Sequence, residues 1–146
     1  MVNKKIVTIF LLLFLITSTI SCVYADDDDR SYSITQALVD IIVDTNGMLH
    51  INETFDYSFD GTFNGVYRDI PLKEGESISN IHVSAEGAYT KVEQHQEDGT
   101  QHIKIYLYSD AAKTQPISDT NVKVHISYDM KNVVTVYQDT ASLQYQ

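Results

Sequence analysis

The chain has 146 residues, of which 20 are acidic and 10 are basic, so its formal net charge is −10 at neutral pH. A surface of this charge repels nucleic acid and anionic lipid headgroups, and we expect no nucleic-acid partner. The length is sufficient for one domain with a hydrophobic core. Tyr, Val, Ile, Thr and Phe are abundant and only two prolines occur, which favours β-strands.

The first 25 residues have the organisation of a secretory signal peptide. Lys4 and Lys5 form a short positive region, residues 6–20 are apolar, and Val23-Tyr24-Ala25 provides a cleavage site. The apolar stretch is shorter than the roughly 20 residues that a transmembrane helix needs. We therefore expect an exported protein, with an uncleaved anchor as the alternative. Cleavage leaves 20 acidic and 8 basic residues, because both lysines are removed, and a net charge of −12.

Cys22 is the only cysteine, and two interpretations of it stay open. It is either an apolar residue of the signal peptide or a lipidated cysteine at the start of the mature chain. Lipoprotein signals usually carry an aliphatic residue where this sequence has Thr19, which favours the first interpretation. After cleavage at Ala25 no disulfide, thiolate nucleophile or cysteine metal site would remain. Residues 26–29 are all Asp, and we expect residues 26–31 to form an acidic, solvated tether.

From Tyr32 onward, apolar residues recur with a period of two, which predicts strands rather than helices. The first strand pair is joined by a turn at Asp44-Thr45-Asn46-Gly47. A three-residue loop with a bulge at Gly47 keeps one face apolar, whereas a two-residue loop would set Asp40 against Glu53. The predicted register therefore pairs Val43 with Leu49, Ile41 with Ile51, Val39 with Glu53 and Ala37 with Phe55.

A second hairpin turns at Asp98-Gly99 and pairs Glu93 with Lys104, Val92 with Ile105 and His95 with His102. Further strands are predicted over residues 78–85 and 122–130, with residues 133–136 as an extension or one more strand. Six or seven short strands predict an all-β fold, a two-layer antiparallel sandwich of the immunoglobulin-like kind over residues 32–146. The last residues stay apolar with no closing turn, so we expect either a longer protein or a short terminal strand.

Glu53 is a carboxylate on a strand face otherwise made of apolar side chains, and it needs a partner. Arg68 is the nearest candidate, near the end of residues 60–71, which we expect to form a loop. The favoured interpretation is a structural ion pair that pins this loop to the sheet. The alternative is a charged cleft that orients a ligand.

The expected loop contains Gly61, Gly65, Tyr67, Asp69 and Pro71. Its glycines permit positive φ or close backbone approach, and Ile70-Pro71 favours an extended exit. A phosphate-binding loop would be followed by a helix, and none is predicted here.

The histidines raise the question of a metal. His95 and His102 would be cross-strand neighbours able to bind a divalent cation with a third ligand, but no HExxH pattern or convincing carboxylate accompanies them. We expect neither a metal nor a cofactor. No nucleophile elbow is present either. Asn52-Glu53-Thr54 matches a glycosylation sequon, and Asn52 would face away from Glu53.

These residues together resemble a known family. Tyr32-Ser-Ile34, the turn at Asn46-Gly47, Glu53 and residues 59–71 are similar to the N-terminal domain of predicted bacterial and archaeal membrane proteins called domain of unknown function 2207. Residues 65–71 are the most specific part. The resemblance implies an extracytoplasmic β-sandwich ahead of membrane-spanning helices, and it brings no established reaction. This chain lacks a C-terminal apolar stretch of about 18 residues or more, so membrane attachment would need the signal segment or a span beyond the sequence.

We therefore predict a non-enzymatic, extracytoplasmic binding or structural module of a membrane-associated cell-envelope protein, whose partner is a protein or another envelope component. The alternative is an exported enzyme, metal-dependent or hydrolytic, that uses Glu53, Arg68 and the histidines.

Overall fold

The computed structural model describes residues 30–136 and 141–143. The expected signal peptide, Cys22 and the aspartates at 26–29 lie outside the described residues. Every regular element in the described part is a β-strand. None of the described residues forms a helix with the length and apolar composition of a membrane span.

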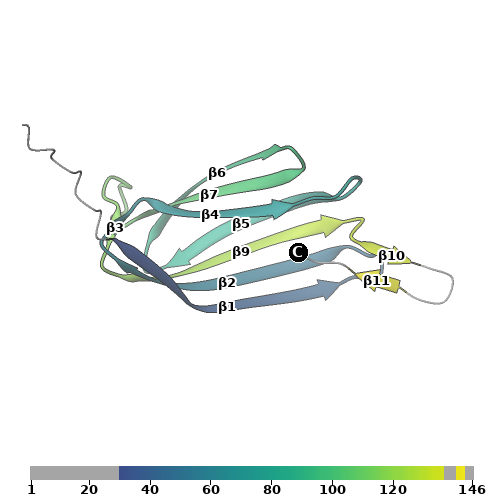
Figure 1. Ribbon diagram of the computed structural model, residues 1–146, viewed down its shortest axis with the longest axis horizontal. Helices are drawn as coiled ribbons and strands as arrows, with labels where there is room; N and C mark the ends of the chain where they lie inside the picture. Colours follow the sequence, from purple (N-terminus) through teal and green to yellow (C-terminus); the bar gives the residue numbers. More distant parts are fainter. Residues whose placement is uncertain (1–29, 137–140, 144–146) are drawn as a thin grey trace, which may run out of the picture.

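Two antiparallel sheets form the two layers of a sandwich (Figure 1). The first has the order β1-β2-β9-β5, with β1 at Ser31–Val43, β2 at Leu49–Asp60, β9 at Asn121–Lys131 and β5 at Ser77–Glu86. The second has the order β4-β7-β6, with β4 at Gly65–Pro71, β7 at Thr100–Tyr108 and β6 at Tyr89–Glu97. Two short pairs are β3 (Thr62–Phe63) with β8 (Ile117–Ser118) and β10 (Val134–Val136) with β11 (Ala141–Leu143). The predicted all-β sandwich is confirmed.

The division into four and three strands is that of a constant-type immunoglobulin sandwich, with one exchange of position. In that arrangement the last strand lies at the edge of the three-stranded sheet. Here the last long strand, β9, lies inside the four-stranded sheet between β2 and β5. The edge position beside β7 is taken by β6.

The register predicted for the first hairpin is confirmed. Val43 pairs with Leu49 and Val39 with Glu53. Gly47 has a φ of 76°, which suits a glycine at the end of the three-residue loop. The consequence is that Glu53 shares the inner face of β2 with apolar side chains.

The register predicted for the second hairpin is also confirmed, with His95 opposite His102 and Glu93 opposite Lys104. Its turn residues, Asp98 and Gly99, both have positive φ, at 48° and 72°. Two successive left-handed residues make a type I′ turn, whose twist matches that of the flanking strands.

The core lies between the two sheets and is filled mainly by the alternating positions of three strands. β2, β7 and β9 each direct every second side chain inward, as their burial patterns show. The buried apolar residues are Leu49, Ile51, Tyr57, Phe59, Ile70, Ile103, Ile105, Leu107, Ile117, Val122, Val124, Ile126, Tyr128, Met130 and Val133.

The prediction of a loop over residues 60–71 is wrong. Only Gly61 and Asn64 fall outside strands after β2, and Gly65, Tyr67, Asp69 and Pro71 all belong to β4. β4 pairs with β7 along its whole length, from Gly65 opposite Tyr106 to Pro71 opposite Thr100.

The glycine and the proline that indicated a loop have another physical reason. A Cβ at Gly65 would collide with the carbonyl oxygen of Ile105 on β7, so the close approach of these backbones needs a glycine. Pro71 ends an edge strand, where a missing N–H breaks no sheet hydrogen bond.

Candidate functional site

Glu53 is the buried carboxylate of the described core. Only 1% of its surface is exposed, because its odd-numbered position on β2 places it on the same face as Leu49 and Ile51. A charge in this position is stable only when it is paired and hydrogen-bonded.

Arg68 provides that pairing from the opposite sheet. Its Nε donates to Glu53 Oε2 at 2.8 Å, and its Nη2 donates to Glu53 Oε1 at 2.6 Å. The fork is bidentate, the geometry in which guanidinium and carboxylate interact most strongly. The structure therefore brings together the two residues singled out in the sequence, and the ion pair joins β2 of one layer to β4 of the other.

Tyr128 completes the cluster and was missed by the sequence analysis. It lies on β9 and its hydroxyl donates to Glu53 Oε1 at 2.9 Å. A tyrosine on a buried strand face usually needs a hydrogen-bond partner, and this was the available signal.

The third nitrogen of the guanidinium also bonds within the fold, since Arg68 Nη1 donates to the backbone oxygen of Asp69 at 2.8 Å. The side chain of Glu53 has no exposed surface, and that of Arg68 is 25% exposed. A ligand therefore cannot reach the carboxylate in this structure. The cluster of Glu53, Arg68 and Tyr128, called the interlayer clamp below, joins the two sheets by hydrogen bonds.

His95 and His102 stack on the outer face of the second sheet, with ring centroids 4.8 Å apart. A carboxylate does lie beside them, because β4 places Asp69 Oδ1 2.9 Å from Nδ1 of His102. Within residues 30–136 and 141–143, no three His, Cys, Asp or Glu side chains are grouped closely enough to hold a metal ion.

A groove of about 530 Å³ crosses the outer face of the second sheet. Its lining includes four residues that we call the tyrosine face: Tyr67, Lys104, Tyr106 and Tyr108. Lys104 Nζ lies 4.6 Å from the ring centre of Tyr106 and 5.5 Å from that of Tyr67. Hydrogen bonds with the hydroxyls of Tyr106 and Tyr67 raise the pKa of Lys104. The tyrosine face thus offers aromatic surface around a stable positive charge.

The tyrosine face could not be assembled from the sequence, because it depends on β4 being a strand. Tyr67 lies opposite Lys104, and Gly65 lies opposite Tyr106.

A family comparison adds to this geometry. The N-terminal domain of the predicted membrane proteins designated DUF2207 matches residues 33–146. The chain belongs to this family. The match confirms the resemblance seen at residues 65–71, and the family description is consistent with membrane association. No curated protein and no solved structure matches the chain.

The four-stranded sheet of this DUF2207 domain carries a second histidine arrangement on its outer face. His125 Nδ1 lies 3.0 Å from the hydroxyl of Thr54, and its Nε2 lies 3.2 Å from Glu86 Oε1. Hydroxyl, imidazole and carboxylate in a row are the parts of a hydrolytic relay. Thr54 and His125, however, lie on interior strands whose N–H groups bond the neighbouring strands, so they provide no oxyanion-stabilising donors.

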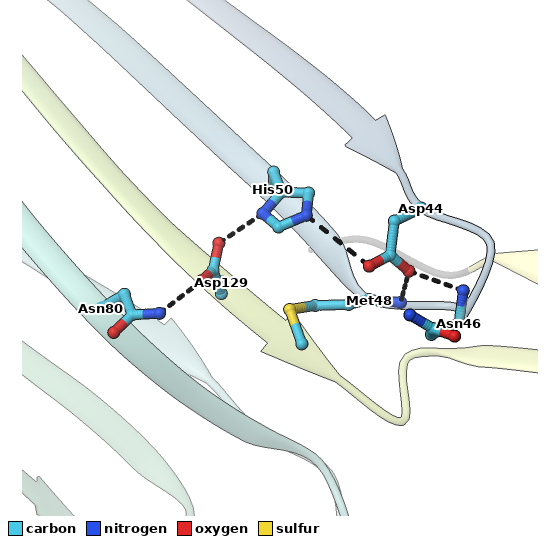
Figure 2. A network of polar contacts seen from close by, with 6 residues as sticks. All are labelled: Asp44, Asn46, Met48, His50, Asn80 and Asp129. Carbon is cyan, nitrogen blue, oxygen red and sulfur yellow. Dashed lines mark hydrogen bonds and ion pairs between the residues drawn. The ribbon is translucent and has the colours of Figure 1, made fainter.

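Figure 2 shows a third polar network, at the end of the DUF2207 domain where the first hairpin turns. His50 lies between two carboxylates, with Nδ1 2.7 Å from Asp129 Oδ1 and Nε2 3.8 Å from Asp44 Oδ2. Asn80 donates to the other oxygen of Asp129 at 2.6 Å. The network connects the turn to β9 and β5.

The hydrogen bonds of this network stabilise charged carboxylates. The hydrogen bond from Asn80, followed by that from His50, lowers the pKa of Asp129. The backbone N–H of Met48 is the main cause of the lowered pKa of Asp44, which also accepts from the N–H of Asn46. Asn80 reaches Asp129 because it has a φ of 54° in a bulge of β5. The arrangement serves the fold.

Asn52, the residue of the glycosylation sequon, is exposed on the outer face of β2, opposite to Glu53. Its position leaves the side chain accessible from solvent.

Proposed function

We propose that the chain is a non-enzymatic, extracytoplasmic module that binds or supports a component of the cell envelope within a membrane-associated protein. The observation that carries the proposal is the interlayer clamp. Glu53, a carboxylate among apolar side chains, is the residue whose position would best suit a catalytic role. Both of its oxygens, however, accept hydrogen bonds from within the fold. The pair therefore supports a structural role.

The extracytoplasmic placement rests on the signal-like residues 1–25 and on the description of the family as predicted membrane proteins. N-terminal sequencing of the protein recovered from an exporting host tests it. The expected new N-terminus is Asp26. A chain that keeps Met1 and stays in the cytoplasm would contradict the placement.

The binding role is supported by the tyrosine face. Tyrosine rings provide rigid apolar contact area together with a hydroxyl, and Tyr67 is 67% exposed. The groove is concave, and Lys104 adds one positive charge to its aromatic wall. Open grooves with aromatic walls and few charged groups are typical of ligand sites.

Co-sedimentation of the purified chain with an insoluble cell-envelope fraction tests the binding role. We expect Tyr67→Ser combined with Tyr106→Ser to weaken binding about tenfold, because two aromatic contacts are lost. Tyr89→Ser is the matched control: Tyr89 is also exposed on this sheet but does not line the groove. Equal binding by the wild type and the double variant would exclude the tyrosine face as the site.

The alternative function, an exported enzyme, would depend on a bound metal or on the relay at His125. Metal analysis of the purified chain, with thermal melts in the presence and absence of EDTA, tests the metal-dependent version of the enzyme. We expect no bound metal and an unchanged melting temperature. Stoichiometric zinc, with a lower melting temperature in EDTA, would favour the metal-dependent enzyme.

A further inference from the structure

β1 exposes an unusual amount of apolar surface. Of the eight large apolar side chains that are exposed in the described part of the chain, six lie on β1, and they are 41% to 62% exposed. These six are Tyr32, Ile34, Leu38, Val39, Ile42 and Val43. Exposed apolar surface on this scale commonly marks an interaction site.

The exposure follows from the unequal size of the two sheets. The interlayer clamp places β4, the edge of the three-stranded sheet, opposite β2. β1 lies one strand further out, as Figure 1 shows, and on its inner face the start of the strand contacts β3 through Tyr32 and Phe63. Val39 and Val43 also face inward, while Leu38 and Ile42 face outward.

The backbone of β1 is also available for pairing. Asp44 N–H donates to Met48 O at 2.9 Å, which fixes the hydrogen-bonding alternation along the hairpin. In this alternation residues 38, 40 and 42 bond β2, and residues 37, 39, 41 and 43 direct their N–H and C=O groups to the free edge. No described strand pairs with that edge. A bulge between Ile34 and Gln36 interrupts the edge, so its regular part is residues 37–43.

We propose that residues 37–43 of β1 accept an added β-strand from a partner polypeptide, an extended apolar segment with a Lys or Arg opposite Asp40. Strand addition uses both features of this edge, because backbone hydrogen bonds give affinity and alternating side chains give specificity. The site is separate from the tyrosine face and goes beyond the proposed function.

Asp40 decides the chemistry of the partner. It is the single charged residue of β1, it stands at the centre of the regular part, and it forms no ion pair with any described residue. A strand with a basic residue at the facing position gains an opposite-charge cross-strand pair. The acidic chain as a whole also attracts a basic segment.

The same residue disfavours a second copy of the chain. Antiparallel pairing of two copies over all of residues 37–43 sets Asp40 directly against Asp40 of the other copy. Like charges in that position destabilise a sheet. Two chains with a net charge of −10 repel each other as well. An edge aspartate of this kind blocks self-association and leaves the edge open to a basic strand.

Two synthetic nine-residue peptides test the proposal. Both alternate Val and Thr, with Lys at the centre of one and Glu at the centre of the other, and both termini are blocked. We expect the Lys peptide to bind the purified chain about tenfold more tightly at low salt, as one cross-strand pair changes from repulsive to attractive. Hydrogen exchange should slow at the N–H groups of residues 37, 39, 41 and 43. Equal binding by the two peptides, or no binding, would overturn the proposal.

Two variants make the test specific to this edge. Val39→Pro removes an N–H that points to the free edge and leaves the bonds to β2 intact, so we expect a cooperative melt without peptide binding. Asp40→Lys is expected to reverse the preference and bind the Glu peptide, which keeps the test decisive if the proline variant does not fold. A concentration-dependent dimer of the wild type that is lost in Val39→Pro would show that a second copy occupies the edge, against the proposal.

Discussion

β1 and β2 are neighbours in one sheet, and both are long strands rich in apolar residues. The inner face of β2 is buried, whereas side chains on the inner face of β1 are exposed. Leu49 on β2 is fully buried, whereas its cross-strand partner Val43 on β1 is 47% exposed. Glu53, a carboxylate, is 1% exposed, whereas its partner Val39 is 41% exposed. The comparison teaches that burial here is decided by the opposite layer. β2 lies opposite β4, to which the Glu53–Arg68 pair joins it, whereas β1 lies one strand further out.

The largest effect is expected from breaking the ion pair that positions β4 over β2. Arg68→Met takes the counter-ion from the buried carboxylate of Glu53, and we expect a loss of about 3–5 kcal/mol in the free energy of unfolding. Chemical denaturation followed by circular dichroism measures it. Asp40→Asn on β1 removes an exposed carboxylate and should change stability by less than about 0.5 kcal/mol.

Truncations on the paired strands sharpen the comparison directly. Leu49→Ala opens a cavity in the core and is expected to cost about 2–5 kcal/mol. Val43→Ala, at the position opposite, should cost less than about 1 kcal/mol, because this side chain buries only part of its surface on folding. Equal losses in thermal or denaturant melts would mean that β1 is covered in solution.

Tyr128→Phe is expected to have a smaller effect than either Arg68→Met or Leu49→Ala, about 1–2 kcal/mol, since it removes one hydrogen bond to a buried charge and keeps the ring. The matched control is Tyr106→Phe on the tyrosine face, whose hydroxyl donates to exposed Glu93. Its melting temperature should equal that of the wild type.

The smallest expected effect is the loss of stability at acidic pH. The pKa values of Asp44 and Asp129 lie below the ordinary value of 3.8, so their interactions stabilise the fold above that pH and are lost as pH falls through the lowered values. Melts between pH 5 and about pH 2 should therefore show falling stability below about pH 4. Asp129→Asn should reduce the slope in this range. An unchanged slope would mean that the network of His50 contributes nothing to folding.

The sequence predicted the parts of the fold that short-range signals define. Gly47 and the Asp98-Gly99 turn determine the registers of both hairpins, because each turn joins strands that are adjacent in the chain. β4 was missed because Gly65 and Pro71 indicate a loop when their partner β7 is not known. Pairing with β7 gives Gly65 its real role, which is close backbone approach.

The residues of the candidate site also differ in how far the sequence could predict their contacts. Glu53 and Arg68 are 15 positions apart, and a charge on an apolar face was enough to connect them. Tyr128 is 75 positions from Glu53, and its contact depends on β9 taking the interior place beside β2. The exposure of β1 was equally hidden, because its own alternation of residues does not indicate whether a strand lies above it.

A double-mutant cycle with Glu53→Gln and Arg68→Met tests the central claim that these residues act as one structural clamp between the layers. The free energies of unfolding of the wild type, both single variants and the double variant give the coupling energy. We predict a coupling of at least about 2 kcal/mol, with the double variant more stable than Arg68→Met alone, because a neutral amide in place of the Glu53 carboxylate removes the buried unpaired charge. Additive losses, with a coupling near zero, would contradict the account.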